Sequence, residues 1–309
     1  MTALQTVGLL AGGGLLLYYG GDVMVKGASR LAQLLGISRA VVGLTVVAFG
    51  TSLPELVVSL TAALQGKGSI AIGNVIGSNI ANVGLIIGLS AILFPIVVAG
   101  RQYLKDLNMV LGVSLLFAIM LLDGTIARWE GLALLGGIIV YAAYRVMVAR
   151  EEVVMANATR SSAAWNVVFI VLGILGLSVG ARMFVDGASE LARALGVSEL
   201  VIGLTVVAYG TSLPELATSL VAAYRRESEI SVGNILGSNL FNLMGVIGPV
   251  SAVAPLVVDR TVLRFELPVM IGFSVALYPL MKMNGKIPRS FAVVLLAGYV
   301  FFLIFLYIR

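Results

Sequence analysis

The hexapeptide GTSLPE occupies residues 50–55 and returns unchanged at residues 210–215. Each copy lies inside a long apolar run, which covers residues 41–64 in the first case and 201–224 in the second. Inserting a charge at the middle of a membrane helix costs about 2.5–3.5 kcal/mol, so an acid at that depth is a candidate for function. Glu55 and Glu215 are therefore the first candidate site residues of the chain.

The proline in each copy predicts a break in the membrane helix. Pro54 has no amide hydrogen to donate to the carbonyl of Gly50, and its ring crowds that carbonyl. Such a break, with free carbonyls, is tolerated only where the backbone lines a cavity or packs within protein. On a helix, Thr51 and Ser52 share a face with Glu55. The motif thus predicts a cluster of oxygen ligands at a broken helix.

The composition is that of a membrane protein. Of the 309 residues, 60% are hydrophobic and 11% charged, whereas a soluble domain carries roughly 25% charged residues. The chain has no Cys or His, which removes disulfides and the ligands most used for zinc and copper. It has no Walker-type phosphate loop, and its basic residues are scattered, so an ATP-driven pump and nucleic-acid binding are both disfavoured.

Apolar runs of about 18–25 residues predict a polytopic helical protein. Ten membrane segments can be drawn, at residues 4–25, 40–64, 70–97, 106–122, 129–148, 164–185, 200–224, 230–257, 265–281 and 290–307. Thirteen Lys and Arg residues fall on one side of this arrangement and seven on the other. Because cytoplasmic loops are enriched in Lys and Arg, we expect both termini outside.

The chain is an internal duplication. A shift of 160 aligns residues 20–82 with 180–242 without a gap, and more than half of the positions are identical. Five segments per copy is an odd number, so the second copy enters the membrane from the opposite side, as in secondary transporters. We expect an all-α polytopic membrane protein: a five-helix repeat at 1–148, a cytoplasmic linker at 149–163 and an inverted repeat at 164–309.

A second motif, GNxxGSNxxN, follows each broken segment at residues 73–82 and 233–242. Asn74, Ser78 and Asn82 are four residues apart, which stacks three polar groups on one helix face. Gly73 and Gly77 are spaced to let another helix approach closely. Polar residues of this kind also join membrane helices by hydrogen bonds. Their place beside two buried glutamates favours a role in the site.

Glu55 and Glu215 are the only acids that the segments place at mid-membrane depth. The others, among them Asp22 and Asp186, fall near segment ends, where we expect solvated charge. Two glutamates with hydroxyl, amide and carbonyl oxygens suit Ca²⁺, which takes six to eight oxygen ligands. The two carboxylates neutralise one divalent ion. The same oxygens could instead hold several Na⁺ ions, so that competition for one site would couple the two.

The paired GTSLPE and GNxxGSNxxN motifs resemble the two α-repeats of the sodium/calcium exchanger family, within the cation/calcium antiporter superfamily. The resemblance implies a prokaryotic-type exchanger without a regulatory domain, in which three Na⁺ exchange for one Ca²⁺ at one alternating-access site. The implied ligands are Thr51, Ser52, Glu55, Ser78, Asn82, Thr211, Ser212, Glu215, Ser238 and Asn242, with the backbone carbonyls of Ala48 and Ala208. The glycine-rich first and sixth helices would form a sliding gate.

The resemblance also has implications for partners and location. Some prokaryotic and the potassium-dependent members carry Asp where this chain has Asn242, so Asn242 resembles the potassium-independent exchangers. We expect no enzyme activity, no cofactor beyond the transported Ca²⁺ and Na⁺, and no obligatory protein partner. The chain would be an integral protein of a prokaryotic cell membrane, with the lipid bilayer as its surroundings.

Three alternative functions remain open at this point. A Ca²⁺/H⁺ antiporter would use the same glutamates to exchange Ca²⁺ for protons, although hydroxyls beside each glutamate suit Na⁺ better than a proton relay. A passive cation channel could use them as a selectivity ring. A purely structural membrane protein would bury them as protonated or hydrogen-bonded groups. Inverted repeats and broken helices favour a transporter over the last two.

Overall fold

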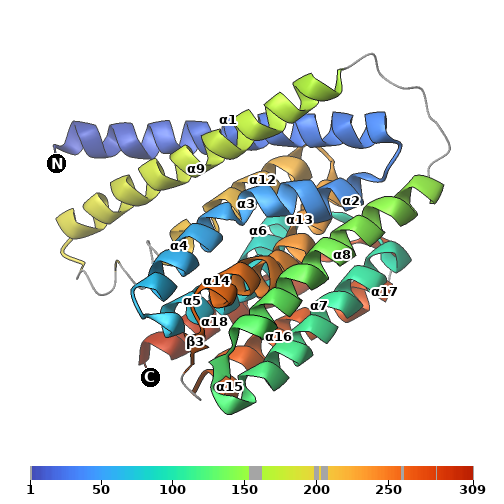
Figure 1. Ribbon diagram of the computed structural model, residues 1–309. Coiled ribbons are helices and arrows are strands. Elements are labelled where there is room, and N and C mark those ends of the chain that lie inside the picture. Colours follow the sequence, from blue (N-terminus) through green and yellow to red (C-terminus); the bar gives the residue numbers. More distant parts are fainter. Residues whose placement is uncertain are drawn as a thin grey trace.

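The computed structural model describes residues 2–152, 162–197, 202, 208–258, 261–282 and 284–308. Helices dominate, and they pack side by side beneath a long pair, α1 (Ala3–Leu35) and α9 (Ala163–Ala194) (Figure 1). Most of the predicted linker at 149–163 and most of residues 198–207 lie outside the described residues.

Each half of the chain contains both long helices and short helical segments. After α1 come α2 (Arg39–Val42), the π-helical segment η1 (Gly43–Val47), α3 (Ala48–Thr51), α4 (Leu53–Leu64), α5 (Gly68–Ala81), the π-helical segment η2 (Asn82–Ile87), α6 (Gly88–Leu93), α7 (Gly100–Met120), the 3-10 turn η3 (Leu121–Asp123) and α8 (Arg128–Glu152). After α9 come α11 (Ala208–Gly210), α12 (Leu213–Tyr224), α13 (Ser228–Leu240), the π-helical segment η5 (Phe241–Val246), α14 (Ile247–Val253), α15 (Thr261–Arg264), α16 (Glu266–Ala276), α17 (Tyr278–Lys282) and α18 (Arg289–Ile308).

The described helices account for nine of the ten predicted membrane segments. Eight are long and apolar enough to span a membrane, and the bent pair Arg39–Thr51 and Leu53–Leu64 makes a ninth span. The remaining segment, residues 200–224, begins largely outside the described residues, and its described end is α12. The helical membrane architecture is therefore confirmed.

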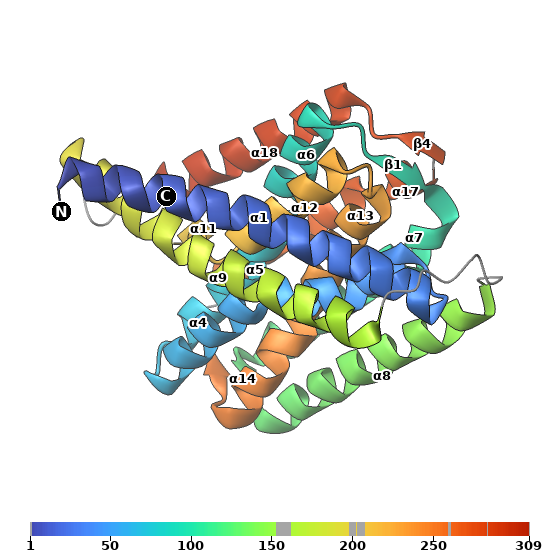
Figure 2. The ribbon, with the colours of Figure 1, turned by 90° about the horizontal axis from the view of Figure 1, so that it is seen from above.

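Helices α1 and α9 occupy equivalent positions in the two repeats, yet they run antiparallel (Figure 2). Gly13 of α1 lies against Gly180 of α9, and Gly27 lies against Asn166. A Cβ atom added to Gly13 would stand 2.8 Å from the carbonyl oxygen of Gly180, so only glycine permits this close approach. Equivalent helices that run in opposite directions are what an inverted repeat requires.

The ends of α1 have clear local causes. The Thr2 hydroxyl accepts the amide hydrogen of Gln5 at 3.3 Å, and the Gln5 side chain accepts that of Thr2 at 2.9 Å, which forms a capping box. The helix ends at Gly36, whose φ of +62° suits glycine. It continues past the predicted end at residue 25 because its last turns pack on the second repeat, where the Ser29 hydroxyl donates to Glu227 at 3.1 Å.

Four short strands tie the two halves of the chain together. Strand β1 (Val97–Ala99) pairs antiparallel with β4 (Asn284–Lys286), and β2 (Thr125–Ile126) pairs antiparallel with β3 (Leu256–Val257). Each pair joins one strand from each repeat. The predicted segments that ended at residues 97 and 257 are thus shorter as helices, because their last residues enter these strands.

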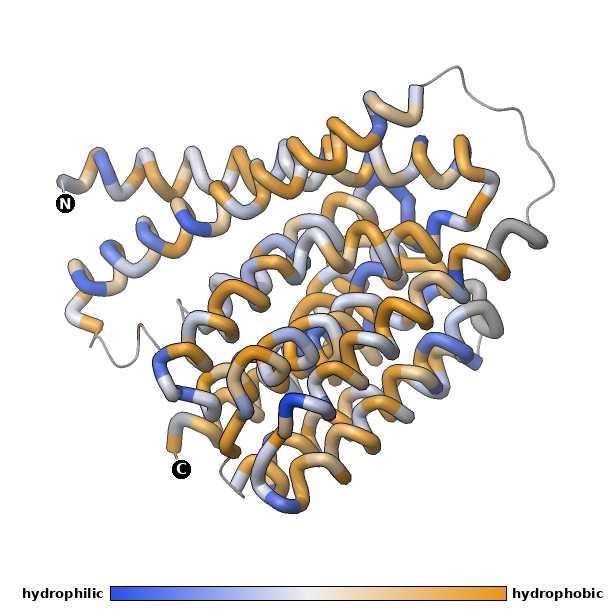
Figure 3. The backbone as a smooth tube through the Cα atoms, viewed as in Figure 1, coloured by the Kyte–Doolittle hydropathy of each residue, from blue (hydrophilic) through white to orange (hydrophobic). Residues whose placement is uncertain are grey.

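Apolar residues line both the core and much of the outer surface (Figure 3). Ile72, Ile76 and Phe117 are fully buried, whereas Val140 and Phe301 are each 69% exposed. An outer surface of this kind, on helices that satisfy their own backbone hydrogen bonds, suits contact with lipid rather than water.

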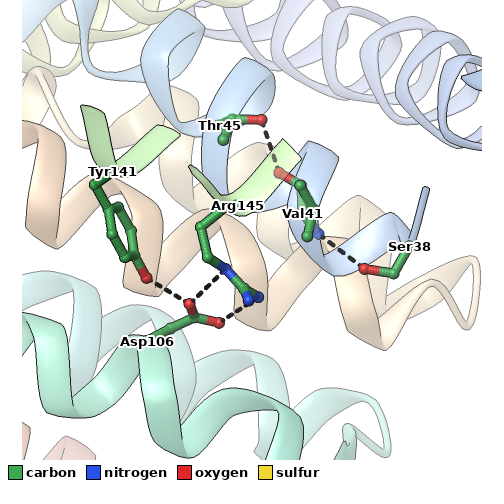
Figure 4. Close-up of polar contacts among 6 residues, drawn as sticks. All are labelled: Ser38, Val41, Thr45, Asp106, Tyr141 and Arg145. Atoms are coloured by element: carbon green, nitrogen blue, oxygen red, sulfur yellow. Dashed lines mark hydrogen bonds and ion pairs between the residues drawn. The ribbon is translucent and has the colours of Figure 1, made fainter. Parts of the chain in front are cut away.

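Two buried, ion-paired acids contradict the expectation of solvated charge at segment ends, and so does Glu130, which is 8% exposed. Asp106 is only 1% exposed, and Arg145 holds it through Nε at 2.9 Å and Nη2 at 3.1 Å, with Tyr141 donating to it as well (Figure 4). Asp22 is 8% exposed and pairs with Lys26 at 2.7 Å and with Arg225. The prediction was wrong for both because their basic partners come from a later turn or from another helix, and paired charges tolerate burial.

Figure 4 also shows how the broken segment begins. The Ser38 hydroxyl accepts the amide hydrogen of Val41 at 3.3 Å and caps α2. The Thr45 hydroxyl donates to the carbonyl of Val41 at 2.7 Å, so this buried hydroxyl is satisfied by its own helix.

Candidate cation site

The predicted helix break lies at Ser52. The helices before and after it differ in direction by 43°, and Pro54 stands in the first turn of α4, where its missing amide hydrogen costs little. Ser52 has φ −84° and ψ 5°, and its counterpart Ser212 has φ −87° and ψ 4°. The two copies of GTSLPE therefore break the helix in the same way.

At each break, the serine donates a hydrogen bond to the glutamate of the other repeat. Glu55 is fully buried and Glu215 is 1% exposed. The Ser212 hydroxyl donates to Glu55 Oε1 at 3.2 Å, and the Ser52 hydroxyl donates to Glu215 Oε1 at 3.1 Å. Ser78 adds a longer contact of 3.4 Å to Glu55 Oε1. The carboxylates of both repeats thus meet in one cross-bonded cluster.

Four of the predicted ligand side chains keep a buried oxygen without a hydrogen-bond partner. Among the described residues, buried acceptor atoms with no hydrogen bond include Oε2 of Glu55 and Glu215 and Oδ1 of Asn82 and Asn242. These atoms form two pairs related by the 160-residue shift. Buried polar groups almost always find a partner, and four oxygens that lack one, two of them from carboxylates, are what a hard cation such as Ca²⁺ or Na⁺ would bind.

Threonines of each repeat form hydrogen bonds with polar residues of the other repeat beside the glutamates. The Thr51 hydroxyl donates to Asn234 Oδ1 at 3.2 Å and lies 3.4 Å from the Ser238 hydroxyl. In the mirror contact, Thr211 donates to Asn74 Oδ1 at 3.4 Å. Eight of the ten predicted side chains therefore make polar contacts in or beside the glutamate cluster, whereas Asn82 and Asn242 bond to asparagines of the other repeat.

The two predicted backbone ligands differ in their surroundings. The Ala48 carbonyl accepts the Ser52 amide hydrogen at 3.0 Å and the Thr51 hydroxyl at 3.3 Å, so it is not free of hydrogen bonds. Ala208 is the first residue of α11, and the Ser212 amide hydrogen is donated to Tyr209 at 3.1 Å instead.

Several polar residues around the site were absent from the predicted ligand set. Asn74 and Asn234 donate to the hydroxyls of Ser59 and Ser219 at 3.0 and 3.1 Å, which turns their Oδ1 atoms toward the threonines. Their four-residue spacing before Ser78 and Ser238 was a signal that could have identified them.

A cavity of about 900 Å³ reaches the site from one side. Its polar wall includes Asn74, Ser78, Thr211 and Ser212. The rest of the lining is mostly apolar and comes from the first half of α4, the second halves of α9 and α18, and α15, with residues that include Val57, Val58, Val185, Val262 and Leu306. The Lys and Arg count predicts this side to be external.

The opposite side of the site is closed by α1. Gly21 of α1 packs against α12, where an added Cβ would meet the Ala217 carbonyl at 3.4 Å. Beyond it, Asp22 pairs with Arg225, and Arg39 pairs with Glu227 at 2.7 Å. The cavity therefore lies on the other side of the site from these ion pairs.

The number of carboxylates in the candidate site is two, Glu55 and Glu215. Within the described ranges, no group of three or more His, Cys, Asp or Glu side chains is arranged to hold a metal ion. The site thus has two carboxylates, and its other oxygens come from hydroxyl, amide and carbonyl groups.

Comparison with known families identifies the duplicated motifs. The family model described as sodium/calcium exchanger protein matches residues 5–147 and again residues 165–308. The chain belongs to the sodium/calcium exchanger family. It is thus a membrane transporter of the antiporter type and not an enzyme.

Relatives of this exchanger-family protein align over nearly all of its length. The sodium/calcium exchanger MaX1 of Methanosarcina acetivorans is 34% identical, with 93% of this chain and 94% of MaX1 covered. The inner membrane protein YrbG of Escherichia coli is 37% identical, with 99% and 96% covered. A solved structure of the sodium-calcium exchanger NCX_Mj, soaked with Na⁺ and no Ca²⁺, superposes with a TM-score of 0.86 at 37% identity, covering 97% of this chain and 98% of that chain.

Proposed function

We propose that the protein exchanges Na⁺ for Ca²⁺ at one site by alternating access. The observation that supports this most is the pair of glutamates, each bonded through one oxygen to the other repeat and each left with one buried oxygen without a partner. MaX1 and NCX_Mj carry the name of sodium/calcium exchangers. The proposed ligands are the ten side chains and two carbonyls predicted from the motifs.

Charge explains why exchange would be obligatory. Two ionised carboxylates facing each other in a buried site are costly when the site is empty. One Ca²⁺ neutralises them, and Na⁺ ions bound to the same oxygens also remove the excess negative charge. An occupied site can then change its access side, whereas an empty one resists. The inverted repeats and the family match support a transporter of this kind over a passive channel.

The coupling ion can be tested with gradients. We expect proteoliposomes containing the purified protein to accumulate ⁴⁵Ca²⁺ when they are loaded with Na⁺ and diluted into Na⁺-free buffer. A pH gradient imposed with Na⁺ absent from both sides should drive no accumulation, although acid should slow Na⁺-driven uptake because protons compete for the carboxylates. Accumulation driven by the pH gradient alone would replace this proposal with Ca²⁺/H⁺ antiport at the same glutamates.

Net charge movement gives a further prediction. If three Na⁺ exchange for one Ca²⁺ at two carboxylates, the Na⁺-loaded site carries one positive charge and the Ca²⁺-loaded site none. Membrane potential should then bias exchange, by about 2.3 kcal/mol per charge per 100 mV across the full field. With the potential clamped, replacing K⁺ by choline should change nothing, since Asn242 adds no third acid. Indifference to voltage, or a strict need for K⁺, would contradict this stoichiometry or this ligand set.

We also propose the orientation. Both termini would be outside a prokaryotic cell membrane, so that the cavity faces the exterior and α1 closes the cytoplasmic side. The two repeats would span residues 1–148 and 164–309, with a cytoplasmic linker between them. Cysteines placed one at a time in this otherwise cysteine-free chain, at Thr2 or Lys105, would test this: a membrane-impermeant thiol reagent applied to intact cells should label only the first.

A further inference from the structure

Four buried asparagines meet where the two repeats cross. Asn79 and Asn82 come from the first repeat, Asn239 and Asn242 from the second, and none is more than 2% exposed. The Asn82 side-chain nitrogen donates to Asn239 Oδ1 at 3.0 Å, and that of Asn242 donates to Asn79 Oδ1 at 2.9 Å. We call these two bonds the amide clasps. Each uses the nitrogen of a proposed ligand and leaves its oxygen without a partner.

The direction of these bonds matters for a cation. A side-chain amide is an acceptor at its oxygen and a donor at its nitrogen, and Ca²⁺ and Na⁺ need the oxygen. If the Asn242 amide turned by half a rotation, its NH₂ group would face the ion and its oxygen would meet Asn79 Oδ1. The clasp therefore opposes that rotation, because it would replace a hydrogen bond by the contact of two acceptors.

Asn79 is itself held in place. Its side-chain nitrogen donates to the backbone carbonyl of Asn239 at 3.2 Å and lies 3.6 Å from the sulfur of Met270. With its nitrogen occupied in this way, Asn79 must present its oxygen to Asn242. The chain of bonds thus begins at a backbone carbonyl, which has no alternative orientation, and ends at the unpartnered oxygen of Asn242.

We propose that Asn79 and Asn239 are positioning residues, which hold the amide oxygens of Asn242 and Asn82 toward the transported cation without binding it themselves. The inference rests on the proposed function in that it takes Asn82 and Asn242 as ligands. Residues that orient metal ligands in this way typically change affinity by about 10–100-fold when removed.

The test is equilibrium ⁴⁵Ca²⁺ binding to the purified full-length protein. Asn79→Leu should raise the half-saturating Ca²⁺ concentration by about 10–100-fold. Asn242→Asp should then recover much of the loss, because a carboxylate has an oxygen at both ends and cannot turn the wrong way. With Asn79 present, the same Asp would place an oxygen against Asn79 Oδ1, so its gain should be smaller than in the Asn79→Leu background.

Controls separate positioning from simple packing. Ser114→Ala removes a buried hydroxyl that bonds only within its own helix α7, and it should leave Ca²⁺ affinity unchanged. Equal gains from Asn242→Asp in both backgrounds, or unchanged affinity in Asn79→Leu, would overturn the proposal. If Asn79→Leu does not fold, Asn239→Leu with Asn82→Asp tests the other clasp, in which Asn239 accepts from Asn82 although its own side-chain nitrogen has no partner among the described residues. A wild-type protein that binds no Ca²⁺ would overturn the site itself, and the clasps with it.

Discussion

Glu55→Gln and Glu215→Gln should each abolish Na⁺-driven Ca²⁺ uptake while leaving the protein folded. Glutamine keeps the size of the side chain and can still accept the serine hydrogen bond, so the change removes mainly charge. A Ca²⁺ ion would then face a single carboxylate in a buried site, and an uncompensated buried charge costs about 3–5 kcal/mol. That penalty corresponds to a loss of more than about 100-fold in apparent affinity.

A matched control is available outside the site. Glu130 is also buried, at 8% exposed, and its carboxylate caps the start of α8 by accepting the Ala127 amide hydrogen at 2.7 Å. Glu130→Gln makes the same chemical change and retains an acceptor there, so uptake in proteoliposomes should stay near the wild-type rate. Near-normal Ca²⁺ transport in either site variant would place the ion elsewhere.

Gly77→Ala should fold and bind Ca²⁺ but exchange it slowly. Among the described residues, nothing lies within 4 Å of a Cβ added at Gly77, which lines the cavity. Its counterpart Gly237 is tightly packed, and a Cβ there would stand 2.3 Å from the Leu44 carbonyl. If the repeats exchange conformations during transport, Gly77 must enter such a contact. Overpacking typically costs about 1–3 kcal/mol, which would slow turnover roughly fivefold to 150-fold.

This prediction separates motion from binding. Turnover of ⁴⁵Ca²⁺ in proteoliposomes should fall while equilibrium Ca²⁺ binding in detergent stays unchanged. Gly112→Ala is the control, because both Gly112 and its repeat counterpart Gly272 have open space around them. Wild-type turnover in Gly77→Ala would show that the first repeat never adopts the packing seen at Gly237.

The glycines of the second motif show what a sequence can and cannot predict. The spacing of Gly73 and Gly77 predicted close helix approach, yet no described residue lies within 4 Å of a Cβ added at either position, whereas their counterparts Gly233 and Gly237 are tightly packed. Both repeats carry the same residues, so no local pattern could distinguish them. The close contacts of Gly233 and Gly237 come from Ala40, Leu44 and Ala48, and most of the equivalent residues of the second repeat lie outside the described part of the chain.

The helix break and the buried acids were predictable because each follows from one short motif. Pro54 and Gly50 were sufficient to predict the bend, and the apolar surroundings were sufficient to predict that Glu55 is buried. The ion pair of Asp106 with Arg145 and the amide clasps were not predictable, since each joins residues from separate segments whose facing sides depend on the packed fold. The π-helical turns at η2 and η5 also had no sequence signal, although Asn82 and Asn242 lie within them.

The central claim is that Na⁺ and Ca²⁺ compete for one site between Glu55 and Glu215. The most direct measurement is ⁴⁵Ca²⁺ bound to the purified protein at equilibrium as Na⁺ is raised, with choline keeping ionic strength constant. The account predicts one Ca²⁺ per chain, complete displacement by Na⁺, and a dependence on Na⁺ steeper than for a single competing ion. Ca²⁺ that stays bound at saturating Na⁺ would contradict a shared site.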